Sequence, residues 1–382
     1  MTDTATASIG FAQDHDVEAF RKSLPFKVEP TNIPGIYSIP APPKDFDPLT
    51  ASQHELLRHG ILIRKPNEED DPVLRASWEQ FCSNHWAKMV RVNPELQVRS
   101  RVSRHPRLRL STESAGLDTQ DNWAGALNIG AQWIAVFANW QVPTVSIPPS
   151  QTLGQENTCP GGMSTPAGPW QSATWIGLGG FVLDQGEEIS ESDIIQVGIQ
   201  QNISAENGEV TYQAFFEWYT SASSIALLLP NLAGSAGFSV QHGDMISASV
   251  INDPHNRHLP PQVSLHNARS GQNFSYVFGS APPGSNYQGG SCEWIMEATN
   301  QTPFSAGGYP TVDDSTFPYF TPVVFNGAIA CNAPGTTVEP LNLMLPLEIH
   351  TQTPNSCQDN GQLTTVTATR ANYTVEIDCT QR

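Results

Sequence analysis

The sequence lacks the marks of a membrane-spanning or signal-bearing chain. No run of about 18 apolar residues occurs in its 382 residues, so we expect no transmembrane helix and no membrane partner. Residues 1–20 carry four acidic side chains and no apolar core, which does not fit a secretory signal peptide. From these features alone the compartment stays unknown.

Cysteine is also scarce, with six residues and no CxxC pair. No Cys/His cluster has the spacing of a zinc site, and we expect neither a metal nor another cofactor. Cys357 and Cys379 flank an expected hairpin and could form a bridge, but the sequence does not fix the connectivity. Four Asn-x-Ser/Thr sites are weak evidence for secretion: Asn202, Asn273, Asn300 and Asn372.

Basic residues almost disappear after residue 118. Residues 119–382 contain four arginines and no lysine against 21 acidic residues, a net charge of −17. Residues 1–118 hold 15 basic and 16 acidic residues, so their charge is nearly balanced. An acidic surface repels phosphate backbones, and we expect no nucleic-acid partner. The change in composition predicts an N-terminal extension at 1–118 and a main domain at 119–382.

The stretch from Lys88 to Arg109 carries seven basic residues against Glu95 alone. It has two interpretations, a solvated basic linker or a cationic arm that covers the acidic domain as a lid. Charge alone favours neither.

Short helices are expected only in the extension, at 16–24, at 52–59 and from Pro72 onward. Thereafter the chain alternates strand-like runs with Gly and Pro turns, which predicts an antiparallel β-sandwich or barrel. The expected strands are 123–137, 173–178, 194–200, 210–219, 225–229, 244–251, 263–267, 274–278, 292–298, 323–330, 343–350, 364–369 and 373–377.

The stretch 291–297 alternates between apolar and acidic residues. In a strand, Cys292, Trp294 and Met296 fall on one side and Glu293, Ile295 and Glu297 on the other. Other strands follow the same rule. If they are neighbours, one sheet face gathers Trp175, Gln196, Gln213, Glu217, Tyr219, Glu293 and Glu297. Such a face is either a binding groove or simply the wet side of an antiparallel sheet.

Several motifs on these strands resemble the glutamic peptidases, or eqolisins, over about residues 119–382. They are Asn122-Trp123-Ala124-Gly125-Ala126, Thr174-Trp175-Ile176-Gly177, Ile195-Gln196-Val197-Gly198, Tyr212 to Tyr219, Gly243-Asp244 and Glu293-Trp294-Ile295-Met296-Glu297. The resemblance implies a concanavalin A-like sandwich of two large sheets with the site on a concave face. It also implies that Gln196 and Glu297 are catalytic and that Trp123, Trp175 and Glu217 line the groove. Glu293 matches a second glutamate, and Tyr219 is a further aromatic candidate for substrate binding.

The resemblance further implies a basic propeptide, which would explain Lys88–Arg109, and an extracellular protein. Three positions depart from the family pattern, since Gly179, Gln200 and Ala298 stand where acidic residues are usual.

The expected function is that of an acid endopeptidase, made as a proform, that acts as a monomer on proteins or peptides. Glu297 would serve as general base and then acid, while Gln196 would stabilise the oxyanion. The alternative is a non-catalytic, lectin-like sandwich whose aromatic residues stack on sugars. A cysteine hydrolase is the weaker third hypothesis, because Cys292 falls on the apolar side of its strand.

Overall fold

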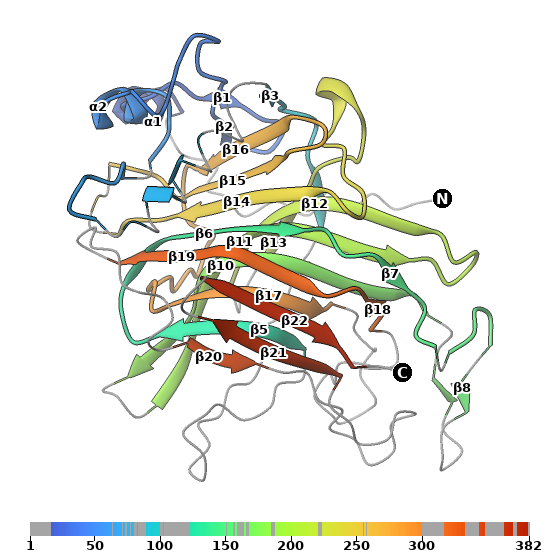
Figure 1. The fold of residues 1–382 in the computed structure, drawn as a ribbon. Helices are drawn as coiled ribbons and strands as arrows, with labels where there is room; N and C mark the ends of the chain where they lie inside the picture. The colour runs from blue at the N-terminus through green and yellow to red at the C-terminus, as the bar shows by residue number, and fades with distance from the viewer. Residues whose placement is uncertain are drawn as a thin grey trace.

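The computed structural model contains two large antiparallel β-sheets packed face to face (Figure 1). It describes residues 17–62, 64–70, 89–99, 102, 122–149, 151–155, 157–158, 164–165, 168–184, 188–220, 224–254, 256, 258–299, 317–332, 344–347, 363–369 and 373–380, with isolated positions between 72 and 82. The fold is the expected β-sandwich. Among the described residues, no helix is long and apolar enough to cross a membrane.

The eight-stranded sheet has the order β20-β5-β17-β10-β11-β12-β13-β4. Its strands are β20 Met344–Leu347, β5 Trp123–Ile129, β17 Ser291–Ala298, β10 Trp170–Asp184, β11 Glu188–Ile203, β12 Val210–Tyr219, β13 Ile225–Leu228 and β4 Gln97–Arg99. β10 and β11 are the longest, with 15 and 16 residues, and form the middle of the sheet.

The ten-stranded sheet has the order β1-β2-β16-β15-β14-β6-β19-β22-β21, with β3 also on β16. Its strands are β1 Glu29–Pro30, β2 Ile36–Ser38, β3 Val90–Arg91, β6 Trp133–Gln141, β14 Met245–Ile251, β15 Gln262–Asn267, β16 Gln272–Phe278, β19 Val323–Asn332, β21 Thr364–Thr369 and β22 Thr374–Cys379. Two small sheets pair β7 Val145–Ser146 with β18 Tyr319–Phe320, and β8 Asn157–Thr158 with β9 Ser164–Thr165.

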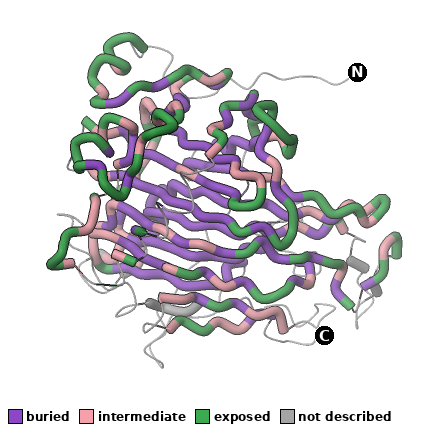
Figure 2. The backbone as a smooth tube through the Cα atoms, turned by 45° about the horizontal axis from the view of Figure 1, so that its top comes forward, coloured by how far each residue is buried: buried purple, intermediate pink, exposed green. Residues whose placement is uncertain are grey.

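The main apolar core lies between the two large sheets, because each contributes the apolar half of its alternating strands. Cys292, Trp294 and Met296 of β17 all belong to this core, as their alternation predicts. The buried strands run through the middle of the molecule, and exposure rises toward the turns and the N-terminal segments (Figure 2). The opposite face of the eight-stranded sheet, here called the site face, carries Glu293, Ile295 and Glu297.

The N-terminal region is built into both sheets. β2 pairs with β16, β3 pairs with β16, and β4 pairs with β13. Ile33, Ile36, Val92 and Leu96 belong to the main core. Two helices, α1 Val17–Ser23 and α2 Gln53–Arg58, lie at the top of Figure 1, and Ser52 caps α2 through a capping box with Glu55. Part of residues 1–118 is therefore structural material of the sandwich.

Most expected strands match the structure closely, but the single strand at 123–137 is wrong. The chain forms β5 and β6 there, in different sheets, separated by a turn at Gly130 whose φ is 101°. A left-handed φ is accessible to glycine at no steric cost, so the turn is possible within a mostly apolar run. The helices expected at 16–24 and 52–59 are present. Pro72, Trp78 and Cys82 are helical too.

Candidate active site

Strand register brings the predicted polar residues onto the site face. Residues paired across an antiparallel ladder point to the same side of the sheet. Gln196 pairs with Gly177 on one side and Glu217 on the other, and Gly177 pairs in turn with Glu293. Gln200, Ala173, Glu297 and Trp123 form a parallel row.

Glu297 is oriented by two side-chain donors. Trp175 donates its indole N–H to Glu297 Oε2 at 2.8 Å, and Asn122 donates its amide to Oε1 at 3.2 Å. Trp123, opposite Glu297 on β5, packs edge-on against Trp175 with ring centroids 4.8 Å apart. Glu297 and both tryptophans have 0% exposure. The carboxylate is therefore held in one orientation inside an aromatic enclosure.

Gln196 is oriented by a carboxylate on the neighbouring strand. Its Nε2 donates to Glu217 Oε2 at 2.9 Å, and both side chains have 0% exposure. Its Oε1 has no hydrogen-bond partner among the described residues. A primary amide carries two N–H groups, so the second remains available to a carbonyl oxygen at this position.

Gln196 and Glu297 lie on the same face, with β10 between their strands. They are not in the same row, because Glu297 lies two same-face positions along β17 from Glu293, which shares the row of Gln196. Trp175 lies between the two rows and contacts Glu297 directly. The fold thus places the predicted pair on one face in different rows, with Glu297 bonded to Trp175 and Gln196 bonded to Glu217.

Glu293 stands out electrostatically. It has 0% exposure, and neither carboxylate oxygen has a hydrogen-bond partner among the described residues. Burial raises the pKa of this carboxyl well above 4.5, and the nearby Ser291 hydroxyl only partly offsets the shift. Glu293 is therefore neutral in acid, and its ionisation is costly.

Glycines make room for this arrangement. A β-carbon on Gly198 would stand 2.5 Å from Trp175 Cβ and 2.2 Å from the Thr174 carbonyl oxygen, so only glycine lets Trp175 lie across β11. Gly179 has φ +93° and sits at a bulge where a β-carbon would meet the Asp193 carbonyl oxygen at 2.2 Å. This backbone excludes the acidic residue usual at that position.

The other two departures have distinct settings. Gln200 Oε1 accepts a bond from Arg99 Nη1 at 3.3 Å, so a basic residue of the N-terminal stretch contacts it. Ala298 faces the main core, and its N–H donates to the Asn122 carbonyl at 2.8 Å.

Residue-by-residue reasoning missed two contributors. Val102 has 4% exposure, belongs to the apolar cluster of the site face, and donates its backbone N–H to Glu217 Oε2 at 3.3 Å. In the sequence Asn122 is only one residue of a motif, and its position before β5 carries no signal for a contact with Glu297. A hydrogen bond donated by a backbone N–H, or a contact between residues far apart in the sequence, cannot be predicted from the type of the residue.

The remaining candidates are placed as follows. Tyr219 is half-buried at the edge of the same apolar cluster, opposite Ile194. Gln213 donates to Gln97 at 3.2 Å. Cys292 is buried in the main core, where burial raises the pKa of its thiol, so it is not a nucleophile. Cys357 lies outside the described residues, as do residues 88, 100–101 and 103–109 of the basic stretch.

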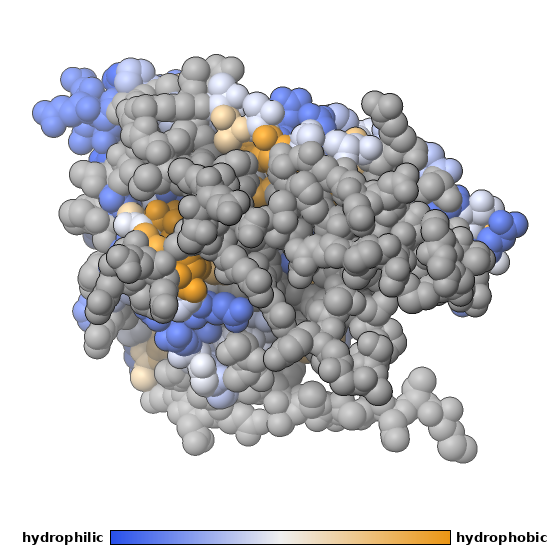
Figure 3. Space-filling view, turned by 90° about the horizontal axis from the view of Figure 1, so that it is seen from below, coloured by the Kyte–Doolittle hydropathy of each residue, from blue (hydrophilic) through white to orange (hydrophobic). Residues whose placement is uncertain are grey.

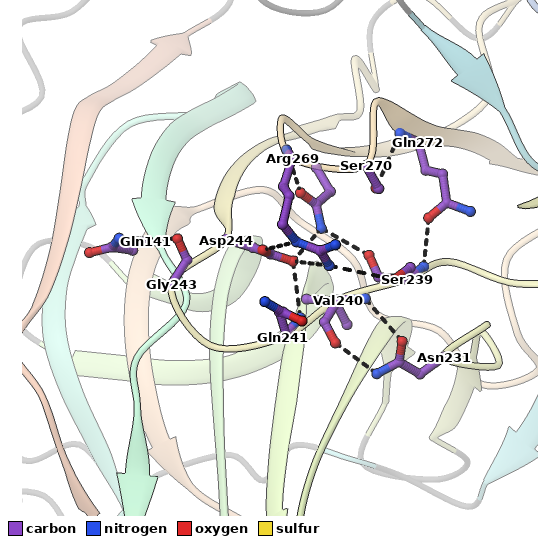
Figure 4. A network of polar contacts seen from close by, with 11 residues as sticks. Gln141, Asn231, Ser239, Val240, Gln241, Gly243, Asp244, Arg269, Ser270 and Gln272 are labelled. Atoms are coloured by element: carbon purple, nitrogen blue, oxygen red, sulfur yellow. Dashed lines mark hydrogen bonds and ion pairs between the residues drawn. The ribbon is translucent and has the colours of Figure 1, made fainter. Parts of the chain in front are cut away.

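The motif Gly243-Asp244 is not at the site. Asp244 precedes β14 in the ten-stranded sheet and accepts bonds from Asn267, Gln241 and Arg269 (Figure 4). Seen from below, the described apolar residues that are visible form a few small areas (Figure 3).

Comparison with known proteins identifies the family of the chain. The family model described as the Peptidase A4 family matches residues 121–377. Scytalidopepsin B of Scytalidium lignicola is 25% identical over 245 residues, covering 57% of this chain and 76% of its own length. Aspergillopepsin-2 of Aspergillus niger is 27% identical over 231 residues, covering 57% of this chain and 67% of its own.

Among solved structures, scytalido-glutamic peptidase with a transition-state analogue inhibitor is 21% identical, with a TM-score of 0.46, over 68% of this chain and 98% of that one. Aspergilloglutamic peptidase from Aspergillus niger is 22% identical, with a TM-score of 0.38, over 55% and 99%. The family match spans most of the chain and all the strands that carry the predicted residues. The chain therefore belongs to the Peptidase A4 family and is a glutamic endopeptidase.

Proposed function

We propose that this peptidase cleaves peptide bonds in acid with Glu297 and Gln196 as its catalytic pair, and that the chain is a proform. The observation that carries the proposal is the orientation of both groups on one face. Two donors fix the Glu297 carboxylate, and the Glu217 carboxylate fixes the Gln196 amide.

In the proposed reaction, Glu297 removes a proton from water while the water oxygen attacks the carbonyl carbon. Gln196 donates its second N–H to the developing oxyanion, a contribution of about 3 kcal/mol in other enzymes. Glu297 then delivers the proton to the amide nitrogen as the carbon–nitrogen bond breaks. An acidic medium keeps the released amine protonated, and a protonated amine cannot attack the new carboxyl group to re-form the peptide bond.

Contacts between the basic N-terminal stretch and the site face support the proposal that the chain is a proform. The catalytic candidates have 0% exposure, so a substrate reaches them only after something moves. The N–H of Val102, within the basic stretch, already bonds Glu217, and Arg99 contacts Gln200. The body beneath carries a net charge of −17, which attracts a basic segment at neutral pH and releases it as carboxylates protonate.

The test is cleavage of a denatured protein at about pH 3–4, where a carboxyl can cycle. Glu297→Gln and Gln196→Ala should each lose at least about 100-fold in kcat, as oxyanion-donor and acid–base deletions do elsewhere. Glu191→Gln, the same chemical change at an exposed position of β11, is the control and should keep full activity.

Full activity in Glu297→Gln would remove the assignment. If Glu293→Gln lost activity while Glu297→Gln kept it, the acid–base role would belong to Glu293, which shares the row of Gln196. Mass analysis of the intact chain during acid incubation tests the proform, because cleavage of the N-terminal region should precede the rise in activity.

A further inference from the structure

We propose that the outer edge of β13 is a binding site for the main chain of extended polypeptide substrates, which add to it as an antiparallel strand in the place now held by β4. The proposal rests on the peptidase function above and names how its substrate is held. It starts from the contacts of β4, which is three residues long, exposed throughout, and last in its sheet.

β4 is a detachable strand. Its residues pair with β13 in the register Ala226↔Arg99, Leu227↔Val98 and Leu228↔Gln97. Anchorage in the main core comes from Leu96, just before the strand, and not from the strand itself. Withdrawal of β4 would leave the N–H and C=O groups of β13 unpaired at an open edge, which is the template that added strands use.

The edge leads directly to the proposed catalytic amide. Three residues after Arg99, Val102 lies buried on the site face with its N–H on Glu217 Oε2 at 3.3 Å. The same oxygen accepts from Gln196 Nε2 at 2.9 Å. A polypeptide that pairs with β13 and places its third following residue where Val102 lies therefore arrives beside Gln196.

Side chains along this path define the chemistry that the site accepts. Arg99 contacts Gln200 at 3.3 Å and Gln97 contacts Gln213 at 3.2 Å, so two alternate positions meet carboxamides. A carboxamide both donates and accepts, so it suits polar side chains of either charge. Val102 joins the cluster of Phe215 and Ala226, which suits an apolar residue. The expected substrate thus carries polar residues at two alternating positions and an apolar residue three positions later.

The experiment opens the edge in the full-length chain. Successive N–H groups of a strand point to opposite sides, so Val98→Pro/Arg99→Pro removes whichever one faces β13. Val98→Ala/Arg99→Lys keeps both N–H groups and is the matched control. The probe is a fluorescent peptide with the sequence of residues 95–103, tested for binding by anisotropy and as an inhibitor of protein cleavage in acid.

We expect the opened variant to bind the peptide and the control to bind at least tenfold more weakly. In the cleavage assay with the opened variant, the peptide should raise the KM for the protein substrate without lowering kcat, because both compete for the edge of β13. Replacing its valine at position 102 by aspartate should weaken it at least tenfold. Replacing its arginine at position 99 by alanine should weaken it in the opened variant but not when Gln200→Ala is added, because that contact is then already absent.

Three results overturn the inference: no binding to the opened variant, a fall in kcat at unchanged KM, or an arginine effect that persists with Gln200→Ala. An opened variant that binds the peptide but cleaves no protein at any pH would instead overturn the proposed function, since binding is measured without turnover.

Discussion

The indole N–H of Trp175 donates to Glu297 Oε2 at 2.8 Å across β10 and β17, with both side chains at 0% exposure. Trp175 pairs with Ile295, so the bond runs diagonally to the next same-face position. Bonds to a charged acceptor are about twice as strong as neutral ones. This contact therefore fixes the direction in which the Glu297 carboxylate points on the site face.

Trp175→Phe keeps an aromatic ring but removes this donor. Because a bond to a charged group contributes about 1.5–3 kcal/mol, kcat should fall roughly 10- to 100-fold with little change in KM. Steady-state kinetics in acid provides the measurement. The control is Trp170→Phe on the same strand, whose N–H bonds Gln151 at 2.6 Å in the core, and which should lower stability but not kcat. Equal kinetic effects in the two variants would contradict the role given to Trp175.

Glu293 should make the protein less stable as pH rises. Its folded pKa lies above the unfolded value of 4.5, so the folded state holds a proton that the unfolded state releases. This contribution is complete below about pH 4.5 and is lost as pH rises toward the folded pKa, at about 1.4 kcal/mol per pH unit. Urea unfolding across that range measures it. Glu293→Gln, which cannot ionise, should flatten the dependence, and an unchanged slope would refute it.

Residues 119–382 alone should be much less stable than the full chain. Removing residues 1–118 takes away β1 to β4 and the core side chains Ile33, Ile36, Val92 and Leu96. Burying one such side chain contributes about 1.5–3 kcal/mol, so the four together contribute about 6–12 kcal/mol, comparable to a typical margin of 5–15 kcal/mol. Thermal unfolding compares the two chains. Inactivity of the shortened chain would therefore say nothing about whether the N-terminal region covers the site. Local variants such as Val98→Pro/Arg99→Pro test that covering, because they leave the core side chains in place.

Alternation in the sequence was enough to predict the faces of the strands. The period of two in 291–297 placed Glu293 and Glu297 opposite to Trp294, and the structure agrees because each sheet buries one face in the shared core. The order of the motifs along the chain was enough to predict the family. The predicted gathering of Trp175, Gln196, Glu217 and Glu297 on one face is confirmed by register.

What failed or was missed depends on tertiary context. The run 123–137 is mostly apolar, with Asn128 and Gln132 as its polar side chains, and the turn at Gly130 divides it between two sheets. Pairing of β4 with β13 joins residues more than 120 positions apart through backbone groups that every residue carries. The offset between the rows of Gln196 and Glu297 follows from register, which no single strand reveals.

The last prediction concerns the cluster of Figure 4, where Asp244 is 2% exposed and accepts from Asn267 Nδ2 at 2.6 Å, the Gln241 N–H at 3.0 Å and Arg269. Asp244→Ala strands these donors beside a buried position and should cost about 2–4 kcal/mol of unfolding free energy. The Arg269 side chain is 44% exposed, so Arg269→Ala should cost about 1 kcal/mol or less. Urea unfolding ranks the two. The folded fraction of either variant should keep its kcat, because this cluster belongs to the ten-stranded sheet and the proposed catalytic pair lies on the eight-stranded sheet. A larger loss from Arg269→Ala, or a kcat change at full folding, would show that the ion pair does more than anchor the segment that precedes β14.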